Sequence, residues 1–180
     1  MKVIISTCNK YLKFLPLNAF LFNTFWSNDQ NVTVIGYDPP IESLPDNFYF
    51  ESIGDDDSLE NWSTDIRKYL QNMDERYFVW LTEDMFLLHP IDVELLDIFT
   101  KLIKEDKIGR INLVSDLMQR PHDIIESYDD FNILEAKQNT KYRVSVSPSM
   151  WDRDYLLKYL LPGFTPWTFE NYCCTHAKND

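Results

Sequence analysis

The stretch Tyr77-Phe78-Val79-Trp80-Leu81-Thr82-Glu83-Asp84 (YFVWLTED) carries the strongest structural signal in the sequence. Its first five residues are large and apolar, which is typical of a β-strand that is buried on both faces in the middle of a parallel sheet. Two acidic residues follow this strand almost at once. A rigid strand that ends in polar side chains predicts a ligand site at the carboxyl edge of the sheet.

Strand and helix patterns alternate on either side of this stretch. The alternation predicts an α/β fold in which helices flank a mainly parallel, Rossmann-like central sheet, with residues 1–180 forming one domain. Apolar residues at helical spacing predict helices, short β-branched or aromatic runs predict strands, and the remaining segments 115–140 and 162–172 are expected to be loops. The predicted strands are residues 3–5, 31–37, 48–50, 77–81, 111–114 and 142–146, and the predicted helices are residues 15–26, 62–70, 92–107 and 152–161.

The chain is strongly acidic, with 17 Lys and Arg against 29 Asp and Glu and a formal net charge of −12. Such a surface repels nucleic acid and anionic lipid, so we expect neither as a partner. An anionic nucleotide would need a local positive charge, for which a divalent cation held by carboxylates is a natural source. Three cysteines, the lack of a signal-peptide pattern and the lack of a long apolar run predict a cytoplasmic protein without a membrane span.

Polar side chains follow each of the first four predicted strands. Since parallel strands end at the same edge of a sheet, we expect these side chains to gather there. The adjacent carboxylates of Glu83 and Asp84 would repel each other unless a cation such as Mg²⁺ or Mn²⁺ offsets their charge, although they could simply end the strand and cap a turn. The acidic run at 55–57 is either a second metal site or, more simply, a solvated loop. The side chains in question belong to Thr7, Asn9, Tyr11, Asp38, Asp55, Asp56, Asp57, Glu83 and Asp84.

A second candidate region lies near the end of the sequence, from Pro162 to Glu170. Two prolines and a glycine predict a shaped loop, in which Trp167 and Phe169 would offer aromatic faces beside the carboxylate of Glu170. Aromatic faces next to an acid suit a sugar, whose C–H groups stack on a ring while the acid contacts a hydroxyl. The alternative is an apolar segment that packs down one end of the chain.

Three blocks of sequence together resemble the small bacterial and viral glycosyltransferases that have the GT-A fold and are met in surface-polysaccharide synthesis. The blocks are VIISTCN, WSTDIRKYL followed by YFVWLTEDMFL, and SVSPSMWDRDYL followed by PGFTPWTFE, and they span residues 3 to 170. In that family an acidic motif, usually Asp-x-Asp, holds a divalent cation against the diphosphate of a nucleotide-sugar donor. Here an adjacent Glu-Asp pair stands in the matching place.

The resemblance implies a role for several residues of this sequence. Asp84 would be the metal ligand for Mn²⁺ or Mg²⁺, and Glu83 would contact the ribose, a metal-bound water or the donor sugar. Glu170 would be the general base of an inverting transfer to a saccharide or another hydroxyl-bearing acceptor, and His176 is a further candidate metal ligand. The nucleoside would lie against Thr7, Asn9 and Tyr11, with Asp38 in the same pocket and Trp62 and Arg67 at its border.

Two other functions fit parts of the same pattern. A sugar-nucleotide nucleotidyltransferase has a related fold, but no glycine-rich phosphate loop follows the first predicted strand. A carbohydrate- or protein-binding module without catalytic activity would tolerate the loss of Glu170 or Asp84, and both residues are present. The leading prediction is therefore an inverting, metal-assisted glycosyltransferase.

Overall fold

The computed structural model describes residues 1–115, 118–129 and 131–178. Strands interspersed with helices make up the first two thirds of the chain, as the apolar patterns predict. The elements are β1 (Lys2–Ser6), η1 (Asn9–Phe14), α1 (Leu15–Phe25), β2 (Val32–Gly36), β3 (Phe48–Ser52), η2 (Leu59–Asn61), α2 (Trp62–Asn72), β4 (Tyr77–Thr82), α3 (Val93–Glu105), β5 (Arg110–Asn112), β6 (His122–Ser127), β7 (Asn132–Ala136), β8 (Ser149–Asp152), α4 (Arg153–Tyr159) and α5 (Pro166–His176).

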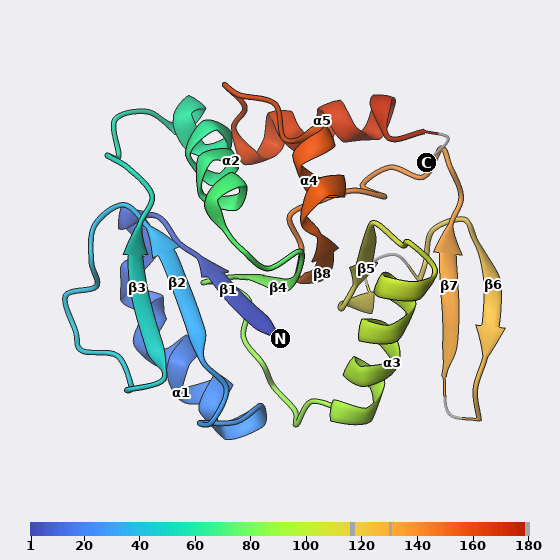
Figure 1. Cartoon of the computed structure of the whole chain (residues 1–180), viewed down its shortest axis with the longest axis horizontal. Helices are drawn as coiled ribbons and strands as arrows, with labels where there is room; N and C mark the ends of the chain where they lie inside the picture. The colour runs from blue at the N-terminus through green and yellow to red at the C-terminus, as the bar shows by residue number, and fades with distance from the viewer. Residues whose placement is uncertain (116–117, 130, 179–180) are drawn as a thin grey trace.

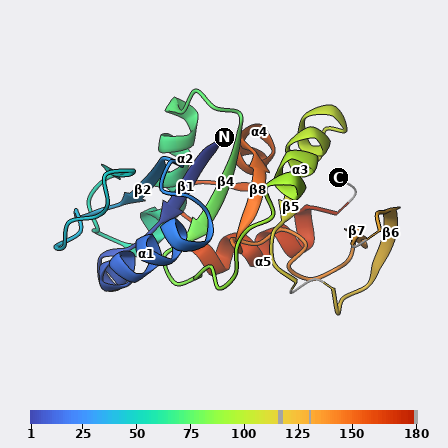
Figure 2. The same ribbon diagram turned by 90° about the horizontal axis from the view of Figure 1, so that it is seen from below.

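Six strands form the central sheet in the order β3-β2-β1-β4-β8-β5. Figure 2 shows β2, β1, β4, β8 and β5 side by side in this order. The strands β3, β2, β1 and β4 are parallel, whereas β8 runs antiparallel to β4 and to β5. The chain builds the sheet outward from β1 to β3 and then returns to the other side of β1 with β4. The predicted α/β fold with a mainly parallel central sheet is therefore confirmed.

Helices cover both faces of the sheet and give three layers (Figure 1). The helices α2, α4 and α5 lie on one face and α1 and α3 on the other, each layer with its own apolar core. Alternate residues of β4 divide between the two cores, since Phe78 and Trp80 join the first and Val79 and Leu81 join the second. The prediction that this strand is buried on both faces is confirmed.

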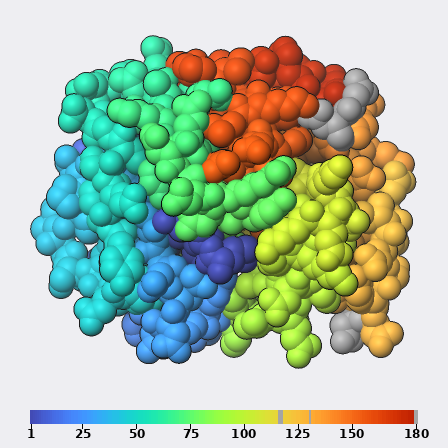
Figure 3. All heavy atoms as spheres, in the orientation of Figure 1, coloured from blue at the N-terminus to red at the C-terminus, as the bar shows by residue number. Residues whose placement is uncertain are grey.

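On the face formed by α2, α4 and α5, a half-buried arginine links α2 to the end of α4. Arg67 of α2 donates through Nη1 to the backbone carbonyls of Leu157, at 2.6 Å, and Leu160, at 3.0 Å. The last carbonyls of a helix have no partner within the helix, so a guanidinium there satisfies them. In Figure 3 the green surface of α2 lies directly against the orange surface of α4.

The last third of the chain differs from the prediction. Residues 142–146, predicted as a strand, are irregular, and Tyr142 has a φ of 61°, which interrupts an extended backbone. The strand that enters the sheet is β8, whose residues Ser149–Asp152 pair with both β4 and β5. The predicted helix at 152–161 is α4, which begins at Arg153 because the Asp152 side chain accepts a hydrogen bond from the Asp154 amide as its N-cap.

Two segments expected to be loops contain regular structure. Within 115–140, β6 and β7 form a separate antiparallel hairpin. Within 162–172, the helix α5 begins at Pro166, after Thr165 and Thr168 cap each other's backbone amides. Thr followed by Pro is a helix-start signal, so the loop predicted for this segment is wrong from Pro166 onward. Among the described residues, no helix has both the length and the apolar content that a membrane crossing requires.

Candidate functional site

The loops after β1 and β4 lie side by side at the carboxyl edge of the sheet. Ser6 and Thr82, the last residues of the two strands, are register partners. The ladder continues beyond them, since the Glu83 amide donates to the Ser6 carbonyl at 3.2 Å and the Thr7 amide donates to the Ile35 carbonyl at 2.9 Å. The strand order reverses between β1 and β4, and such a switch point is where open α/β sheets bind ligands.

Two of the predicted residues, Asn9 and Asp38, join the loops after β1 and β2. Asn9 donates through Nδ2 to Asp38 Oδ2 at 2.7 Å, and its Oδ1 accepts from the Asp38 backbone amide at 3.0 Å. The Asp38 side chain is exposed, and Asn9 is half-buried. This reciprocal pair holds a carboxylate at the rim of the carboxyl edge, within reach of solvent.

Thr7 and Tyr11 flank this pair in different ways. Thr7 is buried, and a Cβ at Gly36 would lie only 2.8 Å from Thr7 Cγ2, so the glycine allows the loop to approach β2 closely. Tyr11 lies in η1, where its ring stacks on Phe14 with 5.8 Å between ring centroids and Lys10 Nζ lies 5.0 Å from the Tyr11 centroid. Thr7 therefore shapes the loop, and Tyr11 offers a half-buried ring beside the edge.

Glu83 is almost fully buried, with 7% of its surface exposed. Burial, with a smaller effect from the negative charge of Asp84, raises the pKa of the Glu83 carboxyl from 4.5 to about 7, against a smaller lowering by a backbone hydrogen bond. The turn that carries Glu83 is fixed by Asn18 of α1, which donates through Nδ2 to the Glu83 carbonyl at 3.2 Å and the Met85 carbonyl at 3.3 Å. The turn is thus held at two points from the helix beneath it.

Asp84 differs from its neighbour in being exposed. The Thr82 hydroxyl donates to Asp84 Oδ1 at 2.8 Å, which orients the carboxylate at the end of β4. One oriented, solvent-facing carboxylate beside a buried one is a donor set that suits Mg²⁺ or Mn²⁺ bound mainly through substrate phosphates and water. Among residues 1–115, 118–129 and 131–178, no three His, Cys, Asp or Glu side chains converge as a metal group.

The loop after β3 carries three aspartates and lies at the same edge of the sheet. Asp55, Asp56 and Asp57 are all exposed, as a solvated loop would be. Asp56 nevertheless affects a group in another loop. The pKa of Cys8, in the loop after β1, is raised mainly by burial and by the charge of Glu83, and the charge of Asp56 adds a smaller rise. The charges of Glu83 and Asp56 thus both act on a thiol in the loop after β1.

Three residues of this edge were missed by the sequence analysis: Asn18, Tyr37 and Asp65. The Tyr37 hydroxyl lies 3.4 Å from Asp65 Oδ2, and burial raises the pKa of both groups. This contact joins the end of β2 to α2. Asn18 had a detectable signal, since it lies on the apolar stripe of its helix beside Leu15 and Ala19, where a polar side chain needs a buried partner.

Trp62 and Arg67, predicted at the border of the donor pocket, both pack into the protein. Trp62 is half-buried against Trp80, at 6.4 Å between ring centroids, and against Phe169, at 6.1 Å. The Arg67 guanidinium is bound to the carbonyls at the end of α4. These contacts give both residues a structural explanation.

Glu170 lies on α5, and its Oε1 accepts a hydrogen bond from the Val146 amide at 3.0 Å. Because β8 is antiparallel to β4 and Ser149 pairs with Trp80, the segment before Ser149 leaves the sheet at the carboxyl edge. Glu170 therefore contacts the segment that leaves the sheet at this edge. The expectation that Trp167 and Phe169 both offer aromatic faces is wrong for Phe169, which is fully buried in the core, while Trp167 is 63% exposed.

His176 lies in the last turn of α5, where its ring stacks on Tyr172 with 3.9 Å between ring centroids. Its Nδ1 is 2.9 Å from the Tyr172 carbonyl oxygen. The described residues place no group of metal-ligating side chains around it. The ring stacking accounts for its position.

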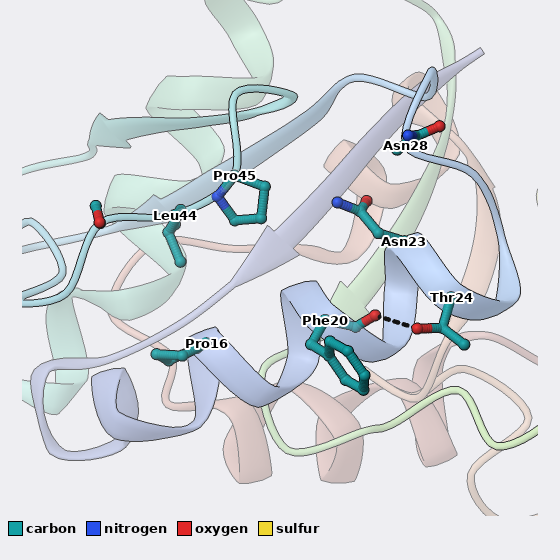
Figure 4. A pocket seen from close by; sticks show the side chains of 8 residues that line it. Pro16, Phe20, Asn23, Thr24, Asn28, Leu44 and Pro45 are labelled. Carbon is teal, nitrogen blue, oxygen red and sulfur yellow. Dashed lines mark hydrogen bonds between the residues drawn. The ribbon is translucent and has the colours of Figure 1, made fainter.

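Two hollows on the protein surface border the outer strands and helices. The first, of about 570 Å³, lies between α1 and the segment before β3 and is lined by residues such as Pro16, Phe20, Leu44 and Pro45 (Figure 4). The second, of about 680 Å³, borders β3 and α2 near Tyr69 and includes Asp55. Neither is lined by Thr7, Asn9, Glu83 or Asp84.

The sequence matches no protein-family model, and no curated protein is significantly similar to it.

Proposed function

We propose that the protein is a glycosyltransferase with a GT-A-like fold, which moves a sugar from a nucleotide-sugar donor to a hydroxyl-bearing acceptor. One observation carries the proposal: the parallel register of β1 and β4 brings the loop after β1 and the pair Glu83 and Asp84 together where the strand order reverses. The resemblance of the three sequence blocks to that family supports the same reading.

The donor is proposed to lie across the loops after β1, β2 and β4. Asn9, Tyr11 and Asp38 would contact the nucleoside, since the first and last form a fixed hydrogen-bonded pair at the rim. Asp84 would hold Mn²⁺ or Mg²⁺ against the diphosphate, with donor phosphates and water completing the shell. Such a cation supplies positive charge that stabilises the departing diphosphate. Glu83, next to Asp84, would contact the ribose, a metal-bound water or the donor sugar.

The acceptor is proposed to be activated by Glu170. The Val146 amide holds Oε1 of this carboxylate, so Oε2 is the atom offered to the acceptor hydroxyl. Glu170 takes the hydroxyl proton as the acceptor oxygen bonds to the anomeric carbon of the sugar. The bond from that carbon to the diphosphate oxygen breaks on the opposite side, and the anomeric configuration inverts.

A thermal-shift panel of nucleoside diphosphates and nucleotide sugars, with Mn²⁺ or with EDTA, tests the donor site. A ligand at a hundred times its Kd should stabilise the protein by about 2.7 kcal/mol, which is a rise of roughly 5–10 °C for a chain of this size. Asp84→Asn should lose the part of the shift that depends on Mn²⁺. Asp74→Asn, an exposed residue just before β4, is the matched control and should keep it. Equal shifts with Mn²⁺ and EDTA in all three proteins would contradict the metal role, and no shift with any nucleotide would contradict the donor site.

A further inference from the structure

A second half-buried arginine, Arg110, contacts the segment that holds Glu170. Arg110 is the first residue of β5 and pairs in register with Trp151 of β8, and its guanidinium lies 5.2 Å from the centroid of the Trp151 ring. From this position it reaches toward the segment 143–147, which leaves the sheet at the carboxyl edge. That segment has no helix or strand of its own, so something outside its backbone must fix its conformation.

Arg110 binds this segment at three alternate positions. Nη1 donates to the Arg143 carbonyl at 3.0 Å, and Nη2 donates to Ser145 Oγ at 3.1 Å and Ser147 Oγ at 2.7 Å. Asn112 Oδ1 also accepts from Nη2, at 3.1 Å, and from the Ser147 hydroxyl at 3.2 Å. One planar, charged group thus binds residues 143, 145 and 147 together.

Val146, the residue between the two serines, contacts Glu170. The amide of Val146 donates to Glu170 Oε1 at 3.0 Å, so the carboxylate is held by the segment that Arg110 holds. The charges of both groups also act on the Cys173 thiol, in opposite directions. Burial, then the charges of Cys174 and Glu170, raise the pKa of Cys173 to about 12, while Arg110 lowers it. Arg110, the segment 143–147 and Glu170 therefore form one connected unit.

We infer that Arg110 is a positioning residue for Glu170, fixing through residues 143–147 the backbone amide that holds the carboxylate at the carboxyl edge. The inference rests on the proposed function, in which Glu170 is the general base. A purely structural Arg110 would stabilise β5 and β8 without controlling Glu170. The two cases differ because a positioning residue has no effect on turnover once the group that it positions is removed.

The first measurement needs no substrate. Amide hydrogen exchange of Val146 is compared in the wild type, Arg110→Gln and Lys101→Gln, an exposed residue of α3 that gives a matched loss of charge. We expect Val146 to exchange at least about tenfold faster in Arg110→Gln, because its hydrogen bond opens with the loosened segment. Amides of β4 should keep their wild-type rates, as should Val146 in Lys101→Gln. Wild-type exchange of Val146 in Arg110→Gln would overturn the inference.

The second measurement uses the nucleotide sugar found by the thermal-shift panel. Arg110→Gln should lower kcat by about 100-fold with little change in the donor KM, since a misplacement near 1 Å has that effect on a catalytic group. Arg110→Lys should recover little, because an ammonium cannot span the same acceptors. In a Glu170→Gln background, Arg110→Gln should lower kcat no further, and an equal loss in both backgrounds would overturn the inference. If Glu170→Gln alone keeps wild-type turnover, the proposed base fails, and the exchange of Val146 still decides whether Arg110 positions that carboxylate.

Discussion

Substitution of the buried carboxyl Glu83 by glutamine should stabilise the protein at neutral and higher pH. The Glu83 pKa is raised from 4.5 to about 7, with burial as the main cause, so the folded protein holds this proton more tightly than the unfolded chain. The difference between the two pKa values corresponds to about 3 kcal/mol. Stability from Glu83 is therefore full below pH 4.5 and is lost as the pH rises through 7.

Glutamine has nearly the same shape and no charge, so Glu83→Gln removes this loss. Its free energy of unfolding should exceed that of the wild type by up to about 3 kcal/mol at pH 8, and the difference should disappear near pH 4.5. Urea unfolding at several pH values between 4.5 and 8, followed by tryptophan fluorescence, measures this difference. Glu42→Gln, in an exposed loop, is the control and should stay within about 0.5 kcal/mol of the wild type throughout. A difference that does not change with pH, or a wild type that is the more stable at pH 8, would refute the reasoning.

Two further predictions concern contacts that hold α2, α4 and α5 together. Arg67→Met should cost about 3 kcal/mol in urea unfolding, because two carbonyls at the end of α4 lose a charged donor. The exposed neighbour Lys68→Met should cost less than about 0.5 kcal/mol, and equal effects would contradict the role of the guanidinium. Phe169→Ala should cost about 3–5 kcal/mol by leaving a cavity in the core. Trp167→Ala should leave stability within about 0.5 kcal/mol, and the opposite ranking of these two variants would show that the two rings are oriented the other way.

The strands and helices in the first half of the fold could be predicted because short stretches of the sequence specify them. Apolar periodicity marks β1 to β4 and the helices between them, and right-handed parallel connections then bring their carboxyl ends to one edge. The convergence of Asn9, Asp38, Glu83 and Asp84 on that edge follows from topology alone.

The second half depends on contacts between distant parts of the chain. Tyr142, Val144 and Val146 alternate as strand residues do, yet β8 forms at Ser149–Asp152, where it pairs with β4. The residues between them, at positions 143, 145 and 147, instead bind the Arg110 guanidinium. Local patterns cannot reveal such a partner, because its effect appears only when the sheet has formed.

The sequence also did not reveal which side chains are buried, and burial decides their roles. The aromatic residues beside Glu170 were expected to face a ligand together, but the helix α5 turns Phe169 into the core and leaves Trp167 outside. Positions two apart on a helix point in different directions, so assigning this segment to a loop removed the information needed to separate them. Arg67 likewise has no sequence signal for its partners on α4.

The rate of sugar transfer by Glu170→Gln is the most direct test of the proposed activity. With the donor from the thermal-shift panel and a set of saccharide acceptors, transfer is followed as the release of nucleoside diphosphate together with the mass of the product. Glutamine keeps an oxygen that can accept from the Val146 amide, so the fold and donor binding should be retained. Turnover should fall by about 10²–10⁴-fold, the usual effect of losing a general base. Turnover at the wild-type rate would contradict Glu170 as the base and, with it, the inverting mechanism.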